Sequence, residues 1–154
     1  MNAGIDPAAN ARTIVSAVDE AGAAGAAMLF TPEMSNLLDG DRARSEPHLR
    51  IEAEDETLAA VRSAARDAGI WVHLGSLALK GQDGKRLNRG FVIDGDGAVR
   101  ARYDKIHLFD VDLATGESWR ESSVYERGGQ AVAAVTPLGR VGLSICYDIR
   151  FPDL

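Results

Sequence analysis

One stretch of the sequence, Gly142-Leu-Ser-Ile-Cys-Tyr-Asp-Ile-Arg-Phe-Pro152, changes from apolar to polar at the only cysteine of the chain. The apolar run from Val141 to Ile145 follows the turn Pro137-Leu-Gly139, and its β-branched residues predict a buried strand. Cys146 stands where that strand would end. Open α/β sheets carry reacting groups at the carboxyl ends of their strands, so this position favours a catalytic thiol. A core cysteine at a strand end is the alternative, since free cysteines are usually buried.

The composition is that of an ordinary globular chain. Its 154 residues are 45% hydrophobic and 26% charged, and the formal net charge is −6. Nucleic acids and anionic membranes require a basic face, so neither partner is expected. No apolar run approaches a membrane span, and the N-terminus lacks the basic-then-apolar pattern of a signal peptide. A single cysteine cannot form an internal disulfide, which favours a cytoplasmic protein.

The rest of the chain alternates between helical and strand patterns. Asp6-Pro7 begins a helix that Gly25 ends, and residues 26–30 form a short apolar strand that ends at Thr31-Pro-Glu33. Another helix is expected from Glu56 to Ala68, and further strands at 70–79, 90–93, 99–103, 131–136 and 141–145. This order predicts an α/β fold in one domain, residues 1–154, with Glu33 and Cys146 each ending a strand of the same sheet. Residues 105–129 have no periodicity and are expected to form a long functional loop.

Four residues at strand ends or in this loop could act together: Glu33, Lys105, Glu121 and Cys146. A carboxylate beside a thiol can take up its proton and later return that proton to a leaving group. A lysine ammonium and a backbone N–H can stabilise the negative oxygen of an acyl-transfer intermediate. The four side chains therefore suit a thiol enzyme that hydrolyses amides.

Each of these residues also has a structural interpretation. Glu33 could cap a turn, Lys105 could be solvated, and Glu121 could pair with Arg120 or Arg127. A Cys–His enzyme is a further alternative, with its base drawn from the three histidines, His48, His73 and His107. His73 falls within an expected strand, which is typical of a core or sheet-face histidine, and a structural hydrogen bond is expected of His107. The histidines and Cys146 lack metal-ligand spacing, and no phosphate loop or dinucleotide motif occurs, so neither a metal nor another cofactor is expected.

Four motifs together resemble a known family: Phe30-Thr-Pro-Glu33, Tyr103-Asp-Lys-Ile-His-Leu-Phe-Asp-Val-Asp112, Arg120-Glu-Ser122 and Ile145-Cys-Tyr-Asp-Ile-Arg-Phe-Pro152. Their order is similar to that of the nitrilase superfamily of carbon–nitrogen hydrolases, and most similar to its Nit-type amidases. The resemblance implies that Glu33 is the general base and later the acid, and that Cys146 is the nucleophile that forms a thioester. It also implies that Lys105 and the backbone N–H of Tyr147 bind the oxyanion, and that Glu121 positions the lysine.

The resemblance further implies an α-β-β-α sandwich, in which Asp148, Arg150 and His107 support the nucleophile turn. Members of the family begin with an additional strand and continue well past the nucleophile, so the chain would be a partial domain truncated at both ends. We therefore expect activity and a homo-oligomer in a full-length form. Residues 1–154 alone are expected to be poorly stable and inactive, with Val141, Leu143 and Ile145 partly exposed.

The predicted function is hydrolysis of the C–N bond of a small carboxamide, with release of ammonia. By resemblance, deaminated glutathione and the ω-amides of 2-oxo dicarboxylic acids are plausible substrates. A nitrilase or a carbamoyl-amide hydrolase is an alternative within the superfamily. A truncated, non-catalytic binding or assembly module is the alternative from another class.

Overall fold

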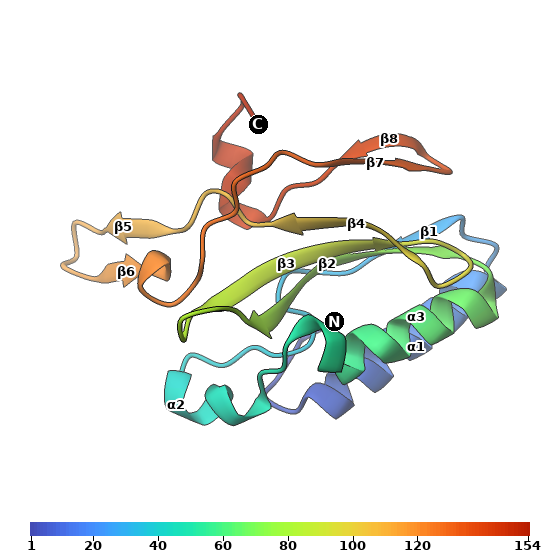
Figure 1. Cartoon of the computed structure of the whole chain (residues 1–154), viewed down its shortest axis with the longest axis horizontal. Helices are drawn as coiled ribbons and strands as arrows, with labels where there is room; N and C mark the ends of the chain where they lie inside the picture. Colours follow the sequence, from blue (N-terminus) through green and yellow to red (C-terminus); the bar gives the residue numbers. More distant parts are fainter.

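A four-stranded sheet forms the centre of the molecule, and the computed structural model describes all residues, 1–154 (Figure 1). Its strands, in spatial order, are β1 (Met28–Phe30), β2 (Trp71–Lys80), β3 (Arg86–Ile93) and β4 (Val99–Asp104). β1 is parallel to β2, and the other neighbouring strands are antiparallel. The α/β fold predicted from the sequence is confirmed.

Two helices, α1 (Pro7–Ala23) and α3 (Glu56–Ala68), lie side by side against one face of the sheet (Figure 1). Helix α3 has the predicted bounds, because both of its ends are specified locally. The Asp55 carboxylate accepts a hydrogen bond from the Leu58 N–H at 2.7 Å, and Gly69 ends the helix with φ 65°. Between the helices the chain forms α2 (Arg42–Ser45) and two short 3-10 turns at 46–48 and 52–54.

The sheet packs against other residues on both faces, which makes it the middle layer of the fold. A cluster of 13 buried residues fills the space between the helices and the sheet, with Ile14 and Val61 from the helices meeting Leu74 and Phe91 from the strands. A second cluster lies on the opposite face and is formed by Met28, Val92, Tyr103, Ala134, Leu143 and Ile145. Leu143 and Ile145 are each only 3% exposed, so the expectation that these two side chains are partly exposed is wrong.

The layer over this second face is a hairpin of β7 (Ala133–Thr136) and β8 (Gly139–Gly142) (Figure 1). The predicted strand 141–145 is therefore wrong in its bounds. The turn ends at Gly139, which adopts φ 99°, and β8 starts there. The strand ends at Gly142, because the next N–H, that of Leu143, donates to the carbonyl of Val132, a residue that precedes β7. Glu33 and Cys146 consequently follow strands of two different sheets, and not of one sheet as predicted.

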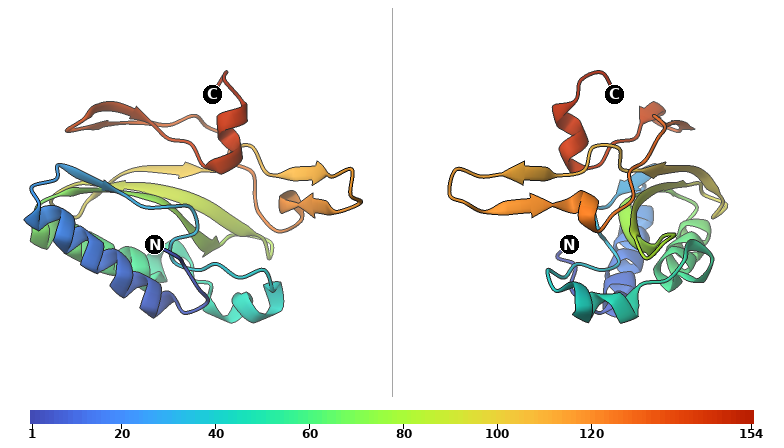
Figure 2. Two further views of the ribbon diagram at one scale, coloured as in Figure 1. Left: turned by 180° about the vertical axis from the view of Figure 1, so that it is seen from behind. Right: turned by 60° about the vertical axis from the view of Figure 1, so that its left-hand side comes forward.

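The segment 105–129 contains regular structure where an aperiodic loop was predicted. β5 (Asp110–Asp112) and β6 (Ser118–Arg120) form a two-stranded hairpin, followed by a 3-10 turn at Glu121–Ser123. Figure 2 shows this hairpin projecting from the body of the molecule. An ion pair of 2.6 Å between Arg120 and Asp112 joins its two strands.

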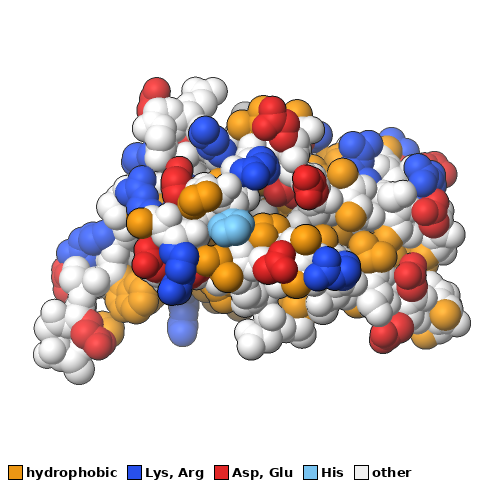
Figure 3. Space-filling view, turned by 90° about the horizontal axis from the view of Figure 1, so that it is seen from below, with side chains coloured by type: hydrophobic (Ala, Val, Ile, Leu, Met, Phe, Trp, Pro, Cys, Tyr) orange, Lys and Arg blue, Asp and Glu red, His pale blue; other side chains and the backbone are white.

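The surface over the helical side of the molecule carries charges of both signs. In Figure 3 acidic and basic side chains alternate there with scattered hydrophobic ones, and neither sign forms a continuous field. None of the helices has the length and apolar character needed to cross a bilayer.

Candidate active site

Glu33 lies on a loop that is docked onto a bulge of β2. The N–H of Met34 donates to the Ser76 hydroxyl at 3.0 Å, and Met34 itself has φ 54°. A side chain at position 75 would place a Cβ 2.2 Å from the Thr31 carbonyl oxygen, so only Gly75 lets the loop approach β2 this closely. The loop therefore holds Glu33 in one position at the end of β1.

Lys105 follows β4 directly and is buried between two carboxylates. Its side chain is 3% exposed, and its Nζ lies 3.1 Å from Glu33 Oε1 and 3.1 and 3.0 Å from the two oxygens of Glu121. Burial lowers the pKa of Lys105, but the charges of Glu33 and Glu121 outweigh this effect, and the pKa of Lys105 is raised overall. Lys105 is therefore an ammonium ion at neutral pH.

Glu121 is held in place by the base of the projecting hairpin. Its Oε2 accepts a hydrogen bond from the N–H of Phe109 at 2.6 Å, and its own N–H donates to the Phe109 carbonyl at 3.2 Å. The hairpin that the sequence did not predict thus delivers the carboxylate that faces Lys105.

Cys146 begins the 3-10 helix Cys146–Arg150, with a left-handed backbone conformation of φ 50°. It is an exposed residue and lines a cavity of about 390 Å³ together with Glu33, Lys105 and Glu121. The structure thus excludes the core-cysteine interpretation. Desolvation raises the pKa of the Cys146 thiol, the charge of Glu33 adds to the effect, and the charge of Lys105 opposes it. The sulfur is accordingly a protonated thiol at neutral pH, and it requires a base.

The turn that carries Cys146 is anchored by Asp148, whose carboxylate is fully buried. It accepts four hydrogen bonds, from the N–H of Ile145 (2.9 Å), the hydroxyl of Tyr103 (2.7 Å), and the N–H (2.9 Å) and Nδ1 (2.7 Å) of His107. Desolvation raises the pKa of Asp148, but these donors outweigh it and the pKa is lowered overall. The imidazole of His107 also stacks on Phe151 at 3.6 Å between ring centroids.

Two further residues of this turn, Tyr147 and Arg150, were predicted to take part in the site. The backbone N–H of Tyr147 donates to no protein acceptor and is therefore free to bind an oxygen. Arg150 stands at the last, solvent-facing position of the 3-10 helix, and its side chain makes no hydrogen bond or ion pair, so its supporting role stays a prediction.

A histidine base is not supported by the positions of the three histidines, because none lines the cavity at Cys146. His73 packs edge-on against Phe30 on the sheet, and burial lowers the pKa of His73. His48 lies in a 3-10 turn, and His107 is bound to Asp148. No group of three or more His, Cys, Asp or Glu side chains has the arrangement of a metal site.

The sequence did not point to Asn88, although it contacts the site directly. Its Nδ2 donates to Glu33 Oε1 at 2.7 Å, and its side chain is buried within β3. The predicted strand began at Gly90, so Asn88 fell outside it. The cavity also has an apolar wall that the sequence did not identify, formed by Met34, Leu38, Phe109, Trp119 and Tyr125.

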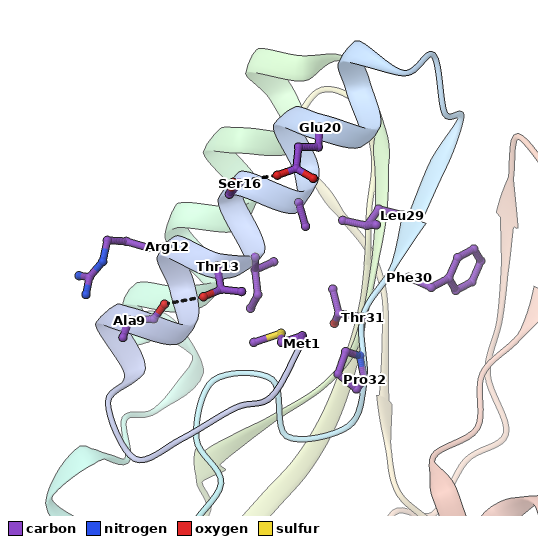
Figure 4. Close-up of a pocket in the computed structure, with 12 residues that line it drawn as sticks. Met1, Ala9, Arg12, Thr13, Ser16, Glu20, Leu29, Phe30, Thr31 and Pro32 are labelled. Carbon is purple, nitrogen blue, oxygen red and sulfur yellow. Dashed lines mark hydrogen bonds between the residues drawn. The ribbon is translucent and has the colours of Figure 1, made fainter.

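A larger hollow, of about 650 Å³, lies between α1 and β1 and contains none of these groups (Figure 4). Two of its polar side chains are bonded within α1: Thr13 donates to the carbonyl of Ala9 at 3.1 Å, and Ser16 donates to Glu20 at 3.3 Å. The size of a cavity alone therefore does not identify the site, and the convergence of reactive groups favours the smaller one.

Comparison with known proteins identifies the family of the chain. Residues 2–154 match the family model described as carbon-nitrogen hydrolase. The chain is similar to the deaminated glutathione amidase of Yersinia enterocolitica, at 36% identity over 84% of this chain and 46% of the relative. It is also similar to the deaminated glutathione amidase of Mus musculus, at 36% identity over 94% of this chain and 46% of the relative.

Two solved structures share its fold. The NitFhit protein of C. elegans matches with a TM-score of 0.88 and 31% identity, over 100% of this chain and 38% of that protein. A mutant amidase from Nesterenkonia sp. AN1, which carries the product of Michael addition of acrylamide at its active site cysteine, matches with a TM-score of 0.81 and 25% identity, over 99% and 57% of the two chains. The chain spans about half the length of the curated relatives it matches, at 46% for both amidases.

Proposed function

This chain belongs to the carbon–nitrogen hydrolase family, and on that premise we propose that the whole protein hydrolyses the C–N bond of a small carboxamide through a thioester on Cys146. The observation that carries the proposal is the convergence of a base, an ammonium and a thiol on one cavity. Glu33 lies 3.1 Å from the Lys105 Nζ, and both residues line the cavity with Cys146.

The first half of the reaction forms the thioester. Glu33 removes the proton from the Cys146 thiol, and the sulfur attacks the carbonyl carbon of the amide. The negative oxygen that develops is stabilised by the Lys105 ammonium and the free N–H of Tyr147. Glu33 then gives its proton to the departing nitrogen, the C–N bond breaks, and ammonia leaves.

The second half of the reaction restores the enzyme. Glu33 accepts a proton from a water molecule, and the resulting hydroxide attacks the thioester carbonyl. The same two donors hold the second oxyanion. When the C–S bond breaks, the sulfur recovers a proton from Glu33 and the carboxylic acid product is released. Glu121 supports both halves, because its charge keeps Lys105 protonated despite burial.

Two features support a deaminated-glutathione-like amide as the substrate class. The curated relatives described above are named for that activity. The cavity also combines an apolar wall with the cationic side chains of Arg42, Arg86 and Arg120, which suits an amide that carries a carboxylate elsewhere in the molecule. By family resemblance the whole protein would be a homo-oligomer, and the single cysteine favours a cytoplasmic location.

Ammonia release by the whole protein from a series of small carboxamides tests the proposal, combined with mass spectrometry of the quenched protein. We expect an acyl adduct on Cys146 during turnover and none in the Cys146→Ala variant. Equal ammonia release by the two proteins would contradict the proposal, as would an adduct at any other residue.

A further inference from the structure

Asn88 is bonded to both the base and the lysine of the proposed site. It lies in β3 and is 1% exposed. Its side-chain Nδ2 donates to Glu33 Oε1 at 2.7 Å, and its backbone carbonyl accepts the N–H of Lys105 at 3.0 Å. One residue thus ties the loop after β1 to the end of β4.

The hydrogen bonds that Glu33 accepts from nitrogen donors are all on one of its two oxygens. Oε1 accepts from Asn88 Nδ2 and from Lys105 Nζ, whereas Oε2 accepts from no nitrogen donor of the protein. Two donors on one oxygen restrict rotation of the carboxylate, and Oε2 is left with its lone pairs available. The orientation of the base is therefore determined by its neighbours.

From this arrangement we propose that Asn88 is a positioning residue, which fixes the Glu33 carboxylate so that Oε2 is the atom that takes the proton of Cys146. In this step the S–H bond breaks, an O–H bond forms on Oε2, and the electron pair stays on the sulfur. The inference rests on the proposed function for its place in the reaction, but the proton transfer itself requires no substrate.

The other end of the same amide supports a functional role. Asn88 Oδ1 is buried and has no hydrogen-bond partner. Exchanging the amide oxygen and nitrogen would not help, because Oδ1 would then face the acceptor Glu33 Oε1. An unsatisfied buried acceptor costs stability, so this asparagine is poorly explained by stability alone.

A matched pair of substitutions separates positioning from stability. Asn88→Asp keeps the shape of the side chain but brings an oxygen to Glu33 Oε1 in place of the donor. Asn36→Asp is the control: Asn36 is 2% exposed, its Nδ2 donates to the Asp55 carboxylate at 3.2 Å, and it does not line the cavity. Both changes therefore place a new carboxyl group against an existing carboxylate in a buried position.

The expected signature of Asn88→Asp is a kcat deficit that depends on pH. At neutral pH the two carboxylates repel and Glu33 turns away, so kcat falls by about a hundredfold, the effect of misplacing a reacting group by an ångström. At lower pH the introduced carboxyl becomes protonated, donates to Oε1 and narrows the deficit relative to the unsubstituted protein. Both proteins contain the other charged or titratable groups that line the cavity with Glu33, namely Asp39, Arg42, Arg86, Lys105, Arg120, Glu121, Tyr125 and Cys146.

Alkylation of Cys146 by iodoacetamide provides a readout that needs no substrate. The chain has one cysteine, so the rate reports on that thiol alone. We expect Asn88→Asp to be alkylated more slowly than the unsubstituted protein at neutral pH, and the two rates to become more similar as the pH falls. Asn36→Asp should lower the melting temperature, but its alkylation rate relative to the unsubstituted protein should not depend on pH. If Asn88→Asp does not fold, Asn88→Ala is expected to lower kcat with KM little changed.

The outcomes distinguish this inference from the proposed function. Suppose that the alkylation rate of Asn88→Asp, relative to that of the unsubstituted protein, depends on pH, but that no amide is hydrolysed. This result would support the positioning role and overturn the amidase proposal. Suppose instead that amides are hydrolysed, and that the rate of Asn88→Asp relative to the unsubstituted protein is constant over pH, as for Asn36→Asp. This result would overturn the positioning role alone. An unchanged kcat in Asn88→Ala would also overturn it.

Discussion

Replacing Asp148 by asparagine keeps the size of the side chain but removes the charge to which the nucleophile turn is bound. The carboxylate accepts four hydrogen bonds, two on each oxygen. Asparagine retains one accepting oxygen, so its amide nitrogen must face either the donors of His107 or those of Ile145 and Tyr103. A hydrogen bond to a charged group stabilises a protein by about 1.5–3 kcal/mol, so losing two of them should cost roughly 3–6 kcal/mol. That is a large part of the about 5–15 kcal/mol that stabilises a typical domain.

The assay is urea unfolding of the unsubstituted protein and of Asp148→Asn between neutral and acidic pH. The pKa of Asp148 is lowered in the folded state, so its contribution to stability is complete above the pKa that the group has in the unfolded chain. That contribution is lost as the pH falls through the lower folded-state pKa. We therefore expect a constant difference in the free energy of unfolding near neutral pH, and a difference that shrinks in strong acid.

Asp55→Asn is the matched control for this experiment. Asp55 is also buried, but it acts as the N-cap of α3, a position in which asparagine is about as favourable as aspartate. The control should lose less than about 1 kcal/mol, the usual scale of a cap effect. If Asp148→Asn lost no more than Asp55→Asn, the view that this carboxylate anchors the nucleophile turn would be refuted.

Substitutions at three further positions test the site and its support. Cys146→Ala should abolish ammonia release and Cys146→Ser should nearly do so, because a hydroxyl is far less acidic than a thiol; turnover by the alanine variant would contradict the assignment of the nucleophile. Lys105→Ala should lower kcat by roughly a hundredfold, the scale for losing one oxyanion donor, in a steady-state assay corrected for folded fraction. Gly75→Ala should lower both the melting temperature and kcat, because its Cβ would lie 2.2 Å from the Thr31 carbonyl; an unchanged melting temperature would count against the docking of the Glu33 loop.

Elements with local signals could be predicted from the sequence, and elements fixed by tertiary contacts could not. Helix α3 has its predicted bounds because Asp55 and Gly69 mark its ends. The β5–β6 hairpin escaped prediction because its strands, Asp-Val-Asp and Ser-Trp-Arg, are only three residues long and have no apolar face of their own. The pattern of apolar residues likewise cannot tell that the sheet formed by β7 and β8 is separate from the sheet that contains β1.

The candidate site shows the same division. The motifs contain Glu33, Lys105, Glu121 and Cys146, and the structure brings all four to one cavity. Asn88 carries no such mark, since a polar residue in a strand is ordinary in a single sequence. Its importance follows from the pairing of β3 with β4, in which the Asn88 carbonyl accepts the Lys105 N–H. Arg150 also lies within a motif, but its side chain makes no hydrogen bond or ion pair, so a place in a motif does not by itself show what a side chain contacts.

Two strained residues explain why local rules are least informative at the site itself. Met34, next to the base, and Cys146, the nucleophile, both have positive φ, a conformation that normally favours glycine. Each such residue costs about 1–3 kcal/mol and persists only where the surroundings compensate. Here the compensation comes from the hydrogen bonds of Ser76 to the first turn and of Asp148 to the second. Glycine at position 146 would relieve the strain but remove the sulfur, so the reactive thiol depends on an anchor elsewhere in the turn.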